Sequence, residues 1–229
     1  MPKRSAKRLW LNDVVRARKE RRGPGGSNVF RIRELLIRQR TKVINARRGH
    51  LGEFGQIVPQ GPANATRLIA IVEGPDSGLP SEAIATLQVL VATLTHLEVE
   101  IGKLDAKIAR RARQNEVACR LMTVPGIGPL IATAIAVLAP APETFQKGRD
   151  FAAWLGLTSR QHSTGDKQRL GATTKMGKRS LRRLLIIGAN SVNIKHHVHA
   201  NAGPRTWLGG MLTRKPPMLV RVALANKMA

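Results

Sequence analysis

The chain has 229 residues and contains no tyrosine, and aromatic residues make up only 3% of it. Proteins that bind single-stranded nucleic acid without sequence preference usually stack bases on aromatic side chains. The shortage of aromatic residues therefore argues against a binder of that class. The hydrophobic fraction of 42% is still sufficient for one or two domains with a packed core.

Cysteine is nearly absent, because Cys119 is the only one in the chain. An internal disulfide is excluded, and no group of Cys and His residues has zinc-site spacing. A single cysteine fits a reducing compartment. No signal peptide is recognisable, and we see no apolar run of membrane-spanning length.

Acidic residues are also scarce, with 14 Asp and Glu against 39 Lys and Arg, a formal charge of +25 and a pI near 11.8. Self-repulsion of that size is tolerated when a polyanion neutralises it, so nucleic acid is the expected partner. An anionic membrane surface is the weaker alternative, because no long basic amphipathic helix with aromatic anchors stands out. We therefore expect a cytoplasmic, nucleoid-associated protein that binds DNA and no membrane.

Residues 1–27 form a basic tail that we expect to be disordered until it meets phosphate. Gly23-Pro24-Gly25-Gly26-Ser27 is expected to break any structure at its end. The alternative is a solvated tail with no role. Its cations are Lys3, Arg4, Lys7, Arg8, Arg16, Arg18, Lys19, Arg21 and Arg22.

Residues 28–120 are predicted to be a helical linker with a coiled coil. In residues 28–51, apolar residues can share a helical face while many Arg and Lys residues crowd the rest, with only Glu34 to offset them. Such a helix suits a phosphate backbone, and a solvated face is the alternative. Residues 52–81 are a connector rich in Gly and Pro.

Residues 82–113 carry the cleanest periodicity in the chain. Steps of three and four keep one apolar seam facing a partner helix. We expect the seam to form a homo-oligomer, and packing on the 28–51 helix within one chain is the alternative. The seam residues are Leu87, Leu90, Leu94, Leu97, Ile101, Leu104 and Ile108.

Residues 121–229 are predicted to be an α-helical domain, so the fold class is mainly α. Between Pro125 and Pro129, Gly126 and Gly128 flank Ile127, and an apolar run follows. Glycine permits close backbone approach, and the amides at a helix start favour an anion. These features predict a helix-hairpin-helix element that binds a phosphate without reading bases. A tight turn before a buried helix is the alternative.

Ser163 stands in a polar loop, Thr158 to Lys167, in which Gly165-Asp166 suits a hairpin or tight turn. A serine hydroxyl is a weak nucleophile unless a base or a field of cations activates it. The alternative is a turn-capping hydroxyl. Beside the 126–128 turn, the nucleic-acid-binding residues we expect are Arg160, His162, Thr164, Lys167, Arg169, Lys175, Lys178, Arg182 and Arg183.

A metal site is not expected in this chain. His196, His197 and His199 lie close together in sequence, but no carboxylate or cysteine accompanies them.

Several motifs occur in an order that resembles the C-terminal part of the insertion-sequence 110/1111 transposases, DEDD-type recombinases that work with a bridge RNA. The resemblance covers roughly residues 29–229. The quoted stretches are Arg33–Arg40, Phe54–Pro59, Val124–Pro129, Gly148–Leu157, Arg160–Gly165, Lys175–Gly177, Leu181–Leu185 and Val222–Lys227.

The resemblance implies DNA transposition with a guide RNA, and Ser163 as the residue that joins covalently to DNA. It also implies Mg²⁺ held by four acidic residues of an N-terminal RuvC-like domain. Family members usually read Ser-Ser-Gly-Gly-Lys where this chain reads Ser163-Thr164-Gly165-Asp166-Lys167, and Asp166 places a negative charge where phosphate should approach. Because only Asp13 and Glu20 precede residue 29, we expect a truncated form without cofactor, inactive by itself.

Overall fold

The computed structural model describes residues 25–61, 64–74, 78–165, 167, 169–198 and 206–229. The described chain divides into two compact units, residues 24–107 and residues 108–229. The described residues are mostly helical with one pair of short strands, which confirms the mainly α fold class. Nearly all of the predicted basic tail, and His199, lie outside the described residues.

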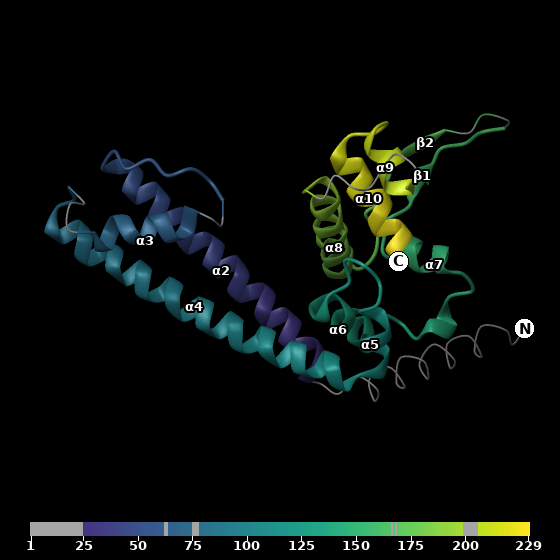
Figure 1. The fold of residues 1–229 in the computed structure, drawn as a ribbon, viewed down its shortest axis with the longest axis horizontal. Coiled ribbons are helices and arrows are strands. Elements are labelled where there is room, and N and C mark those ends of the chain that lie inside the picture. Colours follow the sequence, from purple (N-terminus) through teal and green to yellow (C-terminus); the bar gives the residue numbers. More distant parts are fainter. Residues whose placement is uncertain (1–24, 62–63, 75–77, 166, 168, 199–205) are drawn as a thin grey trace, which may run out of the picture. The chain divides into compact units, whose positions relative to one another are not determined.

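The first unit contains α2 (Gly25–Glu53), α3 (Ala65–Glu73) and most of α4 (Ser81–Gln114) (Figure 1). Helix α2 begins at Gly25, so the prediction that Gly23–Ser27 breaks the structure is wrong at its second half. Glycine is tolerated there because the first amides of a helix have no intrahelical acceptor in any case.

The apolar seam of α4 is buried inside this unit. Leu87, Leu94 and Leu97 are at most 7% exposed, and Leu87 joins a core with residues of α2 and α3. Packing within one chain, the alternative in the sequence analysis, is therefore realised, while association through this seam stays a prediction. The core consists of Leu51, Val58, Leu68, Val72 and Leu87, with Ile44, Ile71, Leu79, Leu90 and Val91 packed around it.

Helix α4 is also long and apolar enough to cross a membrane, with a window of mean hydropathy 1.4. The expectation that no segment reaches membrane-spanning length is therefore wrong on length and composition. A core helix of a globular protein passes the same test. Only 22% of that apolar window is buried, and one such helix is weak evidence of a membrane span.

An acidic residue of α4 neutralises one of the positive charges of α2. Arg33 donates to both carboxylate oxygens of Asp105, at 2.5 and 3.1 Å. The expectation that only Glu34 offsets the cations of α2 is therefore wrong, because a residue 72 positions away supplies a second carboxylate. Arg47 is fully buried, and none of its three nitrogens has a hydrogen-bond partner. Burial lowers the pKa of Arg47, and the charge of Glu73 opposes that shift.

The second unit starts at the end of α4. It continues with α5 (Glu116–Leu121), α6 (Pro129–Leu138), the 3-10 helix η2 (Pro142–Thr144) and α7 (Gly148–Trp154). The strands β1 (Ser159–Gln161) and β2 (Leu170–Thr173) follow, and then α8 (Arg179–Val198), α9 (Trp207–Leu212) and α10 (Pro217–Met228). Helix α8 packs against α6 and α10, and its Leu181 and Leu185 are fully buried.

The polar loop predicted at residues 158–167 is in fact the first arm and tip of an antiparallel β-hairpin. Ser159 pairs with Thr173 and Gln161 with Leu170, with an irregularity between these pairs. Every residue of β1 is exposed, so no apolar alternation marks the strand in the sequence. The backbone hydrogen bonds of the two arms, not a buried face, define the element.

Candidate nucleic-acid interface

The turn between α5 and α6 has the geometry of a compact connection between two packed helices. The amide of Ile127 donates to the Val124 carbonyl at 3.0 Å, and Ile127 is buried. Gly128 is the N-cap of α6, and Pro129 occupies its first position. Pro129 has no amide hydrogen, and the next amides of the first turn have no intrahelical acceptor. An anion is favoured at this helix start.

The two glycines of this turn have different surroundings. A Cβ on Gly126 would lie 2.7 Å from a Val192 methyl group and 2.8 Å from the Gly188 carbonyl oxygen, and φ at Gly126 is +89°. The absence of a side chain at Gly126 therefore allows helix α8 to pack against this turn. A Cβ on Gly128 would meet no atom within 4 Å. Of the two, only Gly128 faces open space into which a phosphate can come, so the expected role in phosphate approach stays a prediction for Gly128.

Ser163 lies between strand β1, which ends at Gln161, and the bridge that pairs Thr164 with Lys167. Its Oγ accepts a hydrogen bond from the Arg169 amide at 3.2 Å, and the His162 amide donates to the Arg169 carbonyl at 2.8 Å. Lys167 pairs with Thr164, and Gly165 between them has a φ of +58°, as a tight turn requires. The accepted hydrogen bond matches the turn-capping alternative, and accepting it does not use the hydroxyl hydrogen of Ser163.

The cations expected around Ser163 are distributed along the hairpin and beyond its base. Arg160, His162, Lys167 and Arg169 are exposed on the two arms. Lys175, Lys178 and Arg183 are exposed after the second arm and on α8. The His162 ring covers Gly171 on the opposite arm, where a Cβ would come within 2.7 Å of it. The hairpin thus presents a basic ribbon around one half-buried serine.

Arg182 differs from the other expected cations because it is half-buried and bonded to the backbone. Its Nη1 donates to the carbonyl oxygens of Leu155 and Lys175, at 3.0 and 2.9 Å, and lies 3.4 Å from that of Met176. A phosphate contact of Arg182, which stays a prediction, would fall to its other two nitrogens. The sequence motif alone does not distinguish this arginine from Arg183 beside it.

Asn226 is a residue of the hairpin base that the sequence analysis did not single out for a role. Its amide nitrogen donates to the Leu157 carbonyl at 3.1 Å, which ties α10 to the chain that leaves α7. Asn226 belongs to the family motif Val222–Lys227, and that membership was the only indication in the sequence of a role for it. Gly156 and Gly177 likewise lie within the family motifs Gly148–Leu157 and Lys175–Gly177, and the sequence analysis gave neither of them a role.

The residues that the structure describes contain no cluster of three or more His, Cys, Asp and Glu that could hold a metal ion. The described part of the chain therefore does not fit a two-Mg²⁺ site. The side chains of His196 and His197 are outside the part that the structure describes, so the expectation that this histidine cluster binds no metal stays a prediction.

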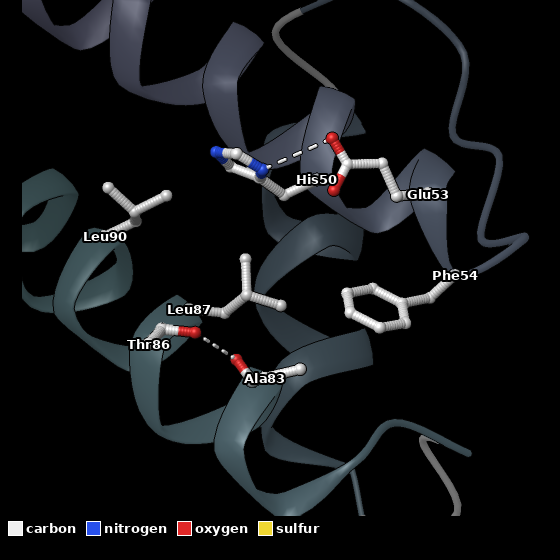
Figure 2. Close-up of a pocket in the computed structure, with 7 residues that line it drawn as sticks. All are labelled: His50, Glu53, Phe54, Ala83, Thr86, Leu87 and Leu90. Carbon is white, nitrogen blue, oxygen red and sulfur yellow. Dashed lines mark hydrogen bonds and ion pairs between the residues drawn. The ribbon is translucent and has the colours of Figure 1, made fainter.

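A cavity of about 380 Å³ lies in the other unit, between the end of α2 and the start of α4 (Figure 2). His50 and Glu53 form an ion pair of 3.6 Å at its edge, and the remaining lining is mainly apolar. Such a lining offers no convergent set of catalytic groups. The lining residues are His50, Glu53, Phe54, Ala83, Thr86, Leu87 and Leu90.

Residues 118–202, which include the turn, the hairpin and the whole of α8, match the model of the transposase IS116/IS110/IS902 family. Over these residues the chain is similar to that family. The matched range contains all the expected site residues, from Gly126 to Arg183.

Curated proteins that are similar to this chain are also named transposases. "Probable family 20 transposase" of Pseudomonas aeruginosa is 41% identical over 204 residues, 88% of this chain and 60% of the relative. "Putative transposase y4pF/y4sB" of Sinorhizobium fredii is 39% identical over 198 residues, 86% of this chain and 51% of the relative. "Transposase for insertion sequence element IS1111A" of Coxiella burnetii is 30% identical, covering 88% and 55%. The chain thus spans between half and three fifths of the length of these family members.

Proposed function

We propose that this chain takes part in DNA transposition, as the DNA-binding and strand-joining portion of an insertion-sequence transposase. The single observation that carries the proposal is the basic hairpin that displays Ser163, found within the stretch that matches the transposase family. The relatives are named transposases, and the proposal extends that activity to this chain.

DNA binding is assigned to the second unit. Residues 108–229 contain 20 Lys and Arg against four Asp and Glu, whereas residues 24–107 contain ten against eight. The exposed start of α6 at Gly128 and the cations of the hairpin hold the phosphate backbone without reading bases. A guide RNA, which the family resemblance implies, would meet the same positive surface.

Ser163 is proposed as the nucleophile. Its Oγ forms a bond to the phosphorus of a DNA phosphodiester while the bond from phosphorus to one deoxyribose oxygen breaks. The hydroxyl proton leaves to a base, and the departing deoxyribose oxygen takes up a proton. Arg160, Lys167 and Arg169 lie exposed on the same hairpin and stabilise the charge that develops on the phosphoryl oxygens.

Mg²⁺ would activate such a step, but the described residues do not provide its ligands. We propose that acidic residues of an RuvC-like domain, which the resemblance places on a separate segment, hold the metal. The 229 residues alone should accordingly bind DNA and leave its strands unbroken.

Binding is tested by the dependence of affinity on salt. Each phosphate contact on duplex DNA contributes roughly −0.9 to the slope of log K against log salt concentration. We expect a steep negative slope for the 229-residue chain. Equal affinity at low and moderate salt would contradict the assignment of the basic surface to DNA.

Covalent chemistry is tested by looking for a protein–DNA adduct on a denaturing gel. The chain alone should give none, and the chain supplied with the acidic domain in trans, Mg²⁺ and the element's RNA should give one. Ser163→Ala should abolish the adduct, while Ser159→Ala, at an exposed serine of the same hairpin, should keep it. An adduct that survives Ser163→Ala would refute the nucleophile and make Thr164 the next residue to test.

The second candidate function is a nucleic-acid-binding protein without catalysis. The hydrogen bond from the Arg169 amide to Ser163 Oγ favours it, because a capping hydroxyl needs no chemistry. This function predicts the same salt dependence and no adduct in the complemented system.

A further inference from the structure

The two strands of the hairpin that carries Ser163 are too short to fix the orientation of the hairpin by themselves. Its strands have three and four residues, and an isolated two-stranded hairpin is marginally stable in water. All residues of β1 are exposed, so no core fixes this arm from the side. The orientation of Ser163 must therefore be set where the two arms join the helices.

The first arm leaves α7 through a glycine turn. The amides of Gly156 and Leu157 donate to the carbonyls of Ala153 and Ala152, and φ at Gly156 is +72°. This is the Schellman arrangement, which ends a helix and sends the chain off in a defined direction. Asn226 then holds the Leu157 carbonyl from α10.

The second arm returns across this turn at van der Waals contact of the two backbones. A Cβ on Gly156 would lie 1.9 Å from the Met176 carbonyl oxygen, and one on Gly177 would lie 1.9 Å from the Trp154 carbonyl oxygen. Lys175, whose amide donates to the Gly156 carbonyl at 3.2 Å, has a φ of +54°, which is uncommon for a residue with a side chain. The crossing therefore excludes side chains at both glycines.

Arg182 lies at this crossing and joins both arms to α8. One nitrogen donates to Leu155 on the incoming chain and to Lys175 on the outgoing chain. Leu155 is fully buried and α8 is anchored by buried leucines, so the guanidinium connects the arms to the packed body of the unit. Hydrogen bonds from a charged donor are among the stronger ones in proteins.

We propose that Arg182 is a positioning residue that fixes the orientation of the Ser163 hairpin relative to helices α5 to α10. The consequence for strand joining rests on the proposed function of Ser163, whereas the orientation itself does not. Arg182 acts through the carbonyls of Leu155 and Lys175, and not by contact with Ser163.

The orientation is measured without DNA, by the distance distribution between spin labels on the native Cys119 and on Gln161→Cys. Cys119 is exposed on α5, and Gln161 is exposed on β1. The wild-type background should give a narrow distribution and Arg182→Met a broad one. The matched control is Arg179→Met, which removes an exposed charge from the first turn of the same helix and should leave the distribution narrow.

Arg182→Lys separates the hydrogen bonds from the charge. Lysine keeps a cation on α8 but lacks the planar donor group, so we expect a width between those of wild type and Arg182→Met. Should Arg182→Met fail to fold, Arg182→Lys carries the test by itself. A distribution as narrow as that of wild type in the folded variants would overturn the proposal.

The functional consequence is measured in the complemented system, as the rate of adduct formation at saturating DNA. A misplacement of about 1 Å can cost on the order of 10²-fold in rate, so Arg182→Met should lose about that factor. Arg179→Met should react as the wild type does. A wild-type rate in Arg182→Met would overturn the positioning role, whereas no adduct in the wild type would refute the proposed function and leave the distance result standing.

Discussion

The two units of this chain differ most in how they treat charge. Residues 24–107 are nearly balanced, and carboxylates of α4 pair with cations, as Asp105 does with Arg33 and Glu100 with Lys103. Residues 108–229 have five times as many cations as acids. Two of these acids, Glu116 and Asp150, stand in the first turns of short helices, where the helix dipole favours them. The second unit therefore carries most of the surplus positive charge outside residues 1–23.

The units also differ in what holds them together. The first depends on apolar side chains that repeat at helical spacing and meet in one core. The second depends in addition on places where backbones touch, at Gly126, Gly156, Gly177 and Gly188. A destabilising substitution should therefore act by burying a charge in the apolar core of the first unit, and by adding a side chain where backbones touch in the second. The following variants test that difference.

The largest effect is expected from Leu94→Asp in the first unit. Leu94 is 1% exposed, so the new carboxylate would be buried without a partner, and we expect a loss of about 4 kcal/mol or more. Ile101→Asp should behave alike. Thermal unfolding followed by circular dichroism measures the loss, and Val89→Asp, at a residue of α4 that is 65% exposed, is the control. Unchanged unfolding of Leu94→Asp would show that the seam is not a core.

Gly177→Ala should be the next in size, with a loss of about 3 kcal/mol. The added Cβ would meet the Trp154 carbonyl oxygen at 1.9 Å in a backbone conformation with φ of +99°. Gly165→Ala is the matched control, because its φ is also positive but no atom lies within 4 Å of its Cβ position. Gly165→Ala should lose only about 1 kcal/mol. Equal losses in the two variants would mean that conformation alone, without the crossing, sets the requirement for glycine.

Arg47→Met should stabilise the first unit, by about 2 kcal/mol. The guanidinium is fully buried without a hydrogen bond, and replacing buried charge by apolar volume is often favourable. Arg38→Met removes an exposed cation from the same helix and should change little. Chemical denaturation of the three proteins compares them, and a clear destabilisation by Arg47→Met would contradict the expectation.

Gly128→Val should weaken DNA binding by ~1 kcal/mol, about fivefold in Kd, while unfolding changes less. The valine side chain would occupy the open space at the start of α6 through which a phosphate approaches. Gly126→Val should instead impair folding, because its Cβ would collide with α8. Fluorescence anisotropy with duplex DNA measures the affinity. An unaltered Kd in a well-folded Gly128→Val variant would favour the simple turn over the phosphate site.

The smallest effect concerns Glu100. A hydrogen bond from Lys103 lowers the pKa of its carboxyl, and the charges of Lys103 and His96 add to this. A lowered folded-state pKa stabilises the protein above the ordinary Glu pKa, and this contribution is lost as the pH falls through the lowered value. Lys103→Met should move the Glu100 pKa back upward in an NMR titration. No movement would show that the pair is not formed in solution.

Much of the helical framework was predictable because side-chain periodicity is a local property. The seam from Leu87 to Ile108 and the turn at Gly126–Gly128 appear where the pattern indicated them. The strands β1 and β2 were missed because an exposed ribbon without a buried face leaves no alternation to detect.

The residues of the candidate site stay a prediction, and only the structure shows how they are arranged. Order of motifs and excess of charge pointed to Ser163 and the cations near it. They did not separate Arg182, whose Nη1 donates to the carbonyls of Leu155 and Lys175 at the hairpin base, from Arg183 beside it, which is exposed.

The amino-acid sequence by itself determined the helical periodicity, the surplus of positive charge and the family motifs, since each is written in residue types and their spacing. Only the tertiary structure decided which glycine faces open space, which arginine holds the backbone, and which carboxylate answers Arg33. The physical reason is that hydrogen bonds and close backbone contacts depend on distances between residues far apart in the chain, such as the 27 positions from Leu155 to Arg182.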